Sequence, residues 1–138
     1  MKGKKDLIFY PMQRPALGEL KKHNKEVGKR FVFFDKNNYP EGNIYIIARE
    51  MINIDNPYVP AEPRSHSVDA IMIFMGLGED LDGLEAEVQL SNEKTIIKSP
   101  ASVFIPKETL NSYKIIKGSG IYMKIVFAPL GDYNSVTK

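Results

Sequence analysis

The sequence predicts an all-β protein, a sandwich or barrel of about eight short strands. Segments rich in β-branched and aromatic residues recur at short spacing, and turn-forming residues separate them. Gly (10) and Pro (9) are frequent, and hardly any segment shows the apolar period of a long helix. With 138 residues, the chain is long enough for one domain with a sizeable core.

The first 30 residues are expected to form a basic N-terminal arm, followed by a barrel domain over residues 31–138. The arm carries nine Lys/Arg against three Asp/Glu (+6), and the remainder carries ten against fourteen (−4). Prolines and glycines interrupt the arm and leave room for one helical turn near Ala16–Lys22. The aromatic residues of the arm lie away from its Lys21–Arg30 cluster, so we expect a solvated segment and no nucleic-acid partner.

Eight strands are expected in the barrel domain. The clearest is Glu85–Leu90, where Glu and Gln alternate with apolar residues as in a strand with one buried face. The last two strands are expected to form a hairpin through Lys117–Gly120, whose glycines can supply the positive φ of a tight turn. In chain order the expected strands are Phe31–Asp35, Asn43–Ile52, His66–Met75, Glu85–Leu90, Thr95–Lys98, Val103–Ile105, Tyr113–Ile116 and Ile121–Phe127.

The strand His66–Met75 is apolar on both faces. Residues 68, 70, 72 and 74 share one face, and Ile71, Ile73 and Met75 share the other. A strand of this kind needs a cover on its outer side, such as a second sheet, the arm or a second subunit. Together with the aromatic run Phe31–Phe34, it leads us to expect a homodimer.

Two segments carry a family resemblance. Residues 64–70 read Arg-Ser-His-Ser-Val-Asp-Ala and run into the apolar strand that ends at Gly76, and Pro106 stands ahead of Asn111 and Tyr113. Their spacing resembles the two motifs of the cupin superfamily. In cupins the first motif supplies two His and one Glu to a metal, and the second supplies one further His. Those four positions fall here on Arg64, His66, Ala70 and Asn111.

The resemblance implies a single cupin-like β-barrel, a double-stranded β-helix or jelly roll, with a degenerate metal site. A guanidinium has no lone pair to donate, and Ala70 offers no ligand atom. Asn111 is a weak ligand for a transition metal, and His66 alone cannot hold one tightly. We therefore expect no metal and no cofactor.

The preferred function is a metal-free binding module for a small anionic metabolite. Arg64 would replace the cation with a bidentate fork for a carboxylate or phosphate. His66, Asn111 and Tyr113 would add hydrogen bonds, while Met72 and Phe74 would form an apolar wall.

Several alternatives stay open at this point. Arg64 could instead turn to solvent and pair with Glu62 or Asp69, and His66 could be a buried residue bonded to a neighbour such as Asn111. An isomerase, epimerase or lyase with His66 as its general acid or base is the second functional hypothesis. A structural or regulatory dimer without a ligand is the third.

Composition sets the remaining limits. The chain has no Cys, which excludes disulfides and thiolate metal sites. No apolar run approaches the length of a membrane span, and the apolar run after the basic start is too short for a signal peptide. We expect a cytoplasmic protein without a membrane partner.

Overall fold

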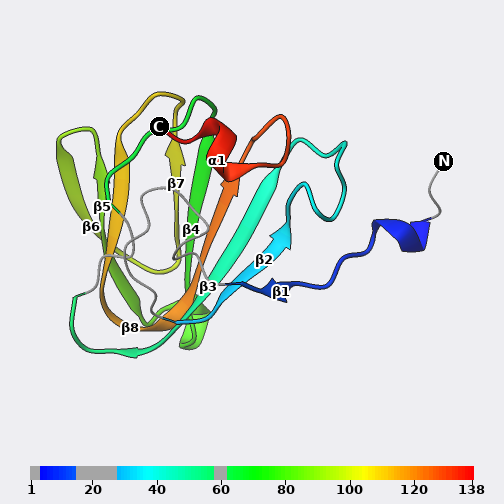
Figure 1. Cartoon of the computed structure of the whole chain (residues 1–138). Helices are drawn as coiled ribbons and strands as arrows, with labels where there is room; N and C mark the ends of the chain where they lie inside the picture. Colours follow the sequence, from blue (N-terminus) through cyan, green and yellow to red (C-terminus); the bar gives the residue numbers. More distant parts are fainter. Residues whose placement is uncertain (1–3, 15–27, 58–61) are drawn as a thin grey trace.

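A computed structural model describes residues 4–14, 28–57 and 62–138. Strands make up most of the regular secondary structure in the described part, which confirms the all-β prediction (Figure 1). The helical turn expected near Ala16–Lys22 lies outside the described residues. The elements are η1 Lys4–Leu7, β1 Met12–Gln13, β2 Arg30–Phe34, β3 Tyr45–Ile54, β4 Ala70–Gly76, η2 Glu79–Leu81, β5 Leu84–Leu90, β6 Glu93–Lys98, β7 Ala101–Ile105, β8 Asn111–Val126 and α1 Tyr133–Val136.

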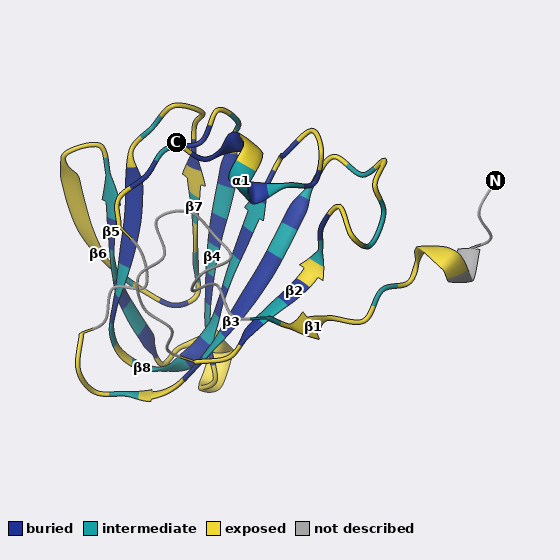
Figure 2. Ribbon diagram, viewed as in Figure 1, coloured by how far each residue is buried: buried dark blue, intermediate teal, exposed yellow. Residues whose placement is uncertain are grey.

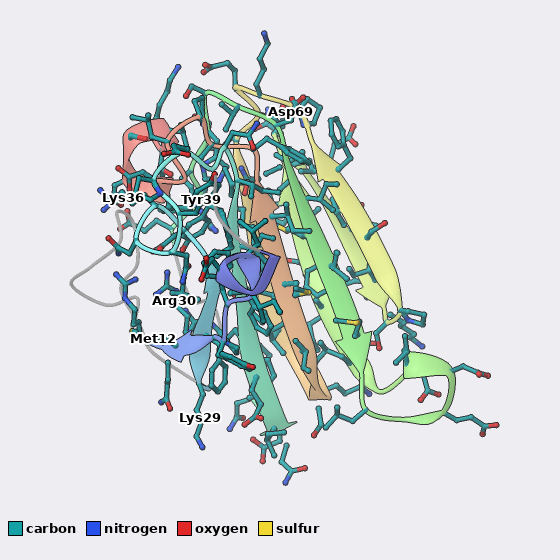
Figure 3. All side chains as sticks on the ribbon, turned by 90° about the vertical axis from the view of Figure 1, so that its right-hand side faces the viewer. Met12, Lys29, Arg30, Lys36, Tyr39 and Asp69 are labelled. Carbon is teal, nitrogen blue, oxygen red and sulfur yellow. The ribbon has the colours of Figure 1, made fainter. Side chains whose placement is uncertain are left out.

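The strands pair antiparallel in two connected layers. One layer has the order β1-β2-β3-β8-β4-β7, and β5 joins β6 to the other part of β8. Figure 3 looks onto the first layer and shows its strands in this order. The apolar core lies between the layers, and the short helix α1 covers one end of the barrel (Figure 1).

The prediction of a hairpin at Lys117–Gly120 is wrong, because β8 is one continuous strand of 16 residues. Its first half pairs with β5, and its second half pairs with both β3 and β4. The two glycines let the strand pass close to its neighbours. A Cβ on Gly118 (φ +110°) would lie 1.9 Å from the carbonyl oxygen of Gly83, and one on Gly120 would lie 2.1 Å from that of Met75.

The first-motif strand begins later than expected, at Ala70, but its two faces are assigned correctly. Ala70, Met72 and Phe74 are buried and face the core, while the residues between them are half-buried (Figure 2). Before β4 the chain makes two isolated bridges instead of a regular strand, through Arg64 and His66.

Residues 4–14 of the N-terminal arm lie at the edge of the first layer and project away from the barrel (Figure 1). Its strand β1 pairs with β2, and Phe9 meets Phe34 edge-on with ring centroids 5.4 Å apart. The arm exposes apolar side chains between 50% and 85%, at Leu7, Ile8, Tyr10 and Met12. Among the described residues, no helix is long and apolar enough to cross a lipid bilayer. The cytoplasmic location and the division at residue 30 stay predictions.

We expect a homodimer built on the outer face of the first layer. Half-buried apolar side chains stand in register across this face, which Figure 3 presents to the viewer, and Phe104 at its edge is 56% exposed. They are Ile46, Ile71, Ile73, Met75, Ile121, Met123 and Ile125. A second copy can cover this face and also take up the apolar side chains of the projecting arm.

Light scattering at micromolar concentration should therefore give twice the chain mass. Phe104→Lys should weaken association at least about tenfold, because it buries a charge in the interface. Ile96→Lys, at a similarly exposed position on β6, should leave the mass unchanged. A monomeric wild type would refute the dimer.

Candidate functional site

The structure brings Arg64 and Asn111 together, as the motif spacing predicts. Arg64 N donates to Asn111 O at 3.0 Å, and Asn111 N donates to Arg64 O at 2.7 Å. The Asn111 side-chain amide also donates to Arg64 O at 2.9 Å and to Thr109 O at 3.1 Å. These bonds fix the side-chain amide of Asn111, and its oxygen faces the amino group of Lys124.

The Arg64 side chain points into the barrel and is only 3% exposed. Its Nε donates to the hydroxyl of Tyr133 at 3.0 Å, and its Nη1 has no hydrogen-bond partner among the described residues. The alternative in which Arg64 turns to solvent is therefore wrong. Glu62 and Asp69 are exposed, and Asp69 accepts a bond from Lys107 N at 2.8 Å instead.

His66 is buried, but it faces the C-terminal segment. Its Nδ1 lies 3.1 Å from the hydroxyl oxygen of Thr137, and its ring meets Tyr133 edge-on at 5.3 Å. The backbone bridge His66–Thr137 holds this arrangement in place. The expected neighbour Asn111 bonds to Arg64 instead, and His66 is not among the described residues that line the cavity next to Arg64. Its assignment as a ligand or catalytic residue stays a prediction.

Four buried cations surround one small cavity inside the barrel. Arg64 lines it with Lys124, and both are almost fully buried. The cavity has a volume of about 20 Å³, room for one water or a few ligand atoms. None of the described residues that line it is acidic. They are Arg30, Tyr45, Ile47, Arg49, Arg64, Tyr113, Tyr122, Lys124 and Tyr133.

Lys124 stands on the inward face of β8, opposite Ile47 on one side and Met72 on the other. Its Nζ lies 3.4 Å from the Asn111 amide oxygen and 6.0 Å from the centre of the Tyr133 ring. Burial lowers the pKa of Lys124 well below its usual value, and the nearby Arg64 charge lowers it further. The side chain therefore loses its proton more readily than a surface lysine does.

Tyrosines form the polar walls of the cavity. Tyr113 and Tyr122 come from the two halves of β8 and stack with ring centroids 4.0 Å apart. The Tyr122 hydroxyl has no hydrogen-bond partner among the described residues, and burial raises the pKa of Tyr122 well above its usual value. Tyr122 therefore keeps its proton and can donate a hydrogen bond to an incoming acceptor.

A second cavity, of about 160 Å³, lies outside the first and shares Arg30, Tyr45 and Tyr133 with it. The carboxyl group of Asp35 lines this outer cavity and accepts a bond from Arg14 at 3.0 Å. The two cavities therefore adjoin at these shared residues.

The predicted wall residues Met72 and Phe74 belong to the core. Phe74 meets Tyr113 and Tyr122 with ring centroids 6.0 and 5.2 Å apart, so it supports the tyrosine wall from behind. Val68 is partly buried against the same core.

The residues at the motif positions offer few metal ligands. Within residues 4–14, 28–57 and 62–138, no three His, Cys, Asp or Glu side chains come close enough to hold an ion. Ala70 occupies the position of the anionic ligand and pairs with Val126 and Ile105 in the sheet. Arg64 places a fixed positive charge at one of these positions, which suits an anion better than a cation.

Sequence reasoning missed Arg30, Arg49, Lys124 and Tyr122. The sequence did contain a signal for this cluster. Residues 45, 47, 49 and 51 lie on one face of β3, and residues 122, 124 and 126 lie on one face of β8. Each strand thus carries a cation on the parity that faces the core. A charged residue in a half-buried strand is normally assigned to the solvent-facing side of the strand. For this reason the buried cluster of cations was not predicted from the sequence.

Comparison with solved structures bears on the fold. KdgF from Halomonas sp. superposes with a TM-score of 0.52 at 15% identity, over 78% of this chain and 87% of that one. A cupin superfamily protein from Desulfitobacterium hafniense gives 0.55 at 8% identity, over 76% and 84%. This chain has the cupin fold. Oxalate decarboxylase from Bacillus subtilis matches this chain with a TM-score of 0.59 at 11% identity, over 92% of this chain but 32% of its own.

The cupin fold confirms the jelly-roll prediction from the two motifs. No protein-family model matches the sequence, and none of the curated proteins matches it. Identities of 8–15% show the architecture of this chain and nothing of its function. Its function has to come from its own side chains.

Proposed function

We propose that this cupin is a metal-free binding module for a small anionic metabolite, whose carboxylate or phosphate group lies between Arg64, Lys124 and Tyr122. The observation that carries the proposal is the set of four buried cations around a cavity with no acidic side chain among its described lining. Arg64 Nη1 and the Tyr122 hydroxyl are donors without partners in the described structure, and an anion would satisfy both.

The energetics favour this occupant. A buried unsatisfied donor costs about 1–3 kcal/mol, and more when it is charged, so a ligand that accepts from these donors gains that free energy. A charge-assisted hydrogen bond to an anion contributes about 1.5–3 kcal/mol, which is roughly ten- to a hundredfold in affinity. Neutral ligands of the same size gain much less from a guanidinium and an ammonium.

A thermal-shift series at constant ionic strength tests the proposal. Lactate, oxalate and phosphate should raise the melting temperature by several degrees, on the order of 5 °C near saturation, whereas glycerol should not. Arg64→Met should abolish the shift. Arg64→Lys should retain only part of it, because lysine keeps the charge but loses the bidentate fork.

Lys98→Met is the matched control, because Lys98 is exposed and lies outside the cavity. It removes one positive charge from the surface and should respond to anions as the wild type does. An equal shift with glycerol, or an unchanged shift in Arg64→Met, would show that the anion does not bind here.

A further inference from the structure

Lys124 has the environment of a nucleophilic amine. Its side chain is 2% exposed, and no acidic residue lies among the described residues that line its cavity. Its Nζ contacts the amide oxygen of Asn111, a neutral acceptor, at 3.4 Å. A lysine that is desolvated and placed beside another cation favours the neutral amine, which carries the free electron pair needed to attack a carbonyl carbon. The lowered pKa of Lys124 agrees with this geometry.

Arg64 can hold the carboxylate of a ligand in the cavity that Lys124 also lines. Arg64 and Lys124 line the same cavity, which has room for only a few atoms. A ligand held by its carboxylate at Arg64 therefore presents the carbon next to that carboxylate to Lys124. In a 2-oxo acid this neighbouring carbon is a carbonyl. The shared cavity thus fits a 2-oxo acid better than a simple carboxylate.

Tyr122 provides the third group. Tyr122 lines the same cavity, and its hydroxyl keeps its proton and has no hydrogen-bond partner among the described residues. A positioned phenol can donate a proton to an oxygen that leaves during condensation. The outer cavity of about 160 Å³ limits the rest of the molecule to a short chain.

We propose that Lys124 forms a Schiff base with a small 2-oxo acid whose carboxylate is bound by Arg64. The neutral amine nitrogen bonds to the carbonyl carbon, and the carbonyl oxygen becomes a hydroxyl group. This oxygen then leaves as water, with one hydrogen from the amine and one proton taken up from solvent through Tyr122. The product is a protonated imine, and no oxidant or reductant takes part. The inference rests on the proposed anion site and names its ligand class.

Borohydride trapping tests the inference directly. Wild-type protein is incubated with pyruvate or glyoxylate and sodium cyanoborohydride at neutral pH, and the adduct is located by intact mass and peptide mapping. We expect one reduced adduct at Lys124, at least about tenfold above any other lysine, because surface lysines are almost fully protonated at this pH. Acetone, which has the carbonyl but no carboxylate, should label Lys124 at least about tenfold less, since a charge-assisted pair is lost.

Three variants sharpen the result. Lys124→Met should lose the adduct, and the surface control Lys98→Met should retain it. Arg64→Met keeps the lysine and should lose the preference for pyruvate over acetone. If Lys124→Met does not fold, the mapping of labelled wild type decides alone.

The outcomes separate this inference from the anion site. If lactate stabilises the wild type through Arg64 but pyruvate leaves no adduct at Lys124, the Schiff base is refuted and anion binding stands. If lactate and pyruvate give no thermal shift and labelling is spread evenly over the lysines, both are refuted. Equal labelling of Lys124 by acetone and pyruvate would refute the 2-oxo acid as the ligand class.

Discussion

Replacing Lys124 by methionine is expected to stabilise the anion-free protein, raising the free energy of unfolding by about 1–4 kcal/mol. Methionine keeps the unbranched stem of lysine and removes a buried amino group from a residue whose strand neighbours are Ile47 and Met72 and whose cavity has no acidic side chain among its described lining. Urea denaturation in a buffer of low anion content measures the change. Lys98→Met should stay within about 0.5 kcal/mol of wild type.

The pH dependence of this stabilisation follows from the depressed pKa of Lys124. Between that pKa and the unfolded value of about 10.4, the unfolded chain binds more protons than the folded chain. Wild-type stability should therefore rise with pH across this window, and Lys124→Met should lose the slope. The groups facing Lys124 in the cavity are Arg30, Arg49, Arg64, Tyr45, Tyr113, Tyr122 and Tyr133.

The arginines keep their charge throughout, and Tyr122 keeps its proton because its pKa is raised. Equal slopes in wild type and Lys124→Met would contradict the assignment. A saturating anion should reduce the advantage of the variant, because only the wild type has the full site. Anion affinity itself should fall as pH rises, since the ammonium form of Lys124 binds the anion.

Gly118→Ala is expected to destabilise the protein by about 3 kcal/mol or more, enough to lower the yield of folded protein. The residue combines a positive φ with a Cβ position 1.9 Å from the backbone oxygen of Gly83, so neither strand can give way cheaply. Circular dichroism melting and the soluble fraction measure the effect. The exposed neighbour Lys117 serves as the control, and Lys117→Ala should change stability by less than about 0.5 kcal/mol. A melting temperature within a degree of wild type for Gly118→Ala would contradict the close approach.

Strand pattern and motif spacing predicted the fold well. The alternation in Glu85–Leu90 and the two motifs place β5, β4 and β7 within a few residues of their observed bounds. The error at Gly118 and Gly120 has a physical cause. A glycine pair signals positive φ equally for a tight turn and for a bent strand, and only the tertiary pairing of β8 distinguishes the two.

The site was predicted only in part. Motif spacing brought Arg64 and Asn111 to facing positions, because that spacing follows from the register of a barrel. Lys124 and Arg49 could not be placed in this way. A lysine or arginine in a strand is ordinarily solvated, and its burial becomes visible only when both faces of the strand are known.

The continuous strand β8 also has a consequence for biosynthesis. It spans residues 111–126 and pairs with β3, β4 and β5, which all precede it in the chain. Neither layer is complete until these residues have left the ribosome, so we expect nascent chains to remain protease-sensitive until β8 has emerged. Closure that depends on such long-range pairing leaves strands unpaired during synthesis, and we expect chaperones that shield unpaired strands to bind at this stage.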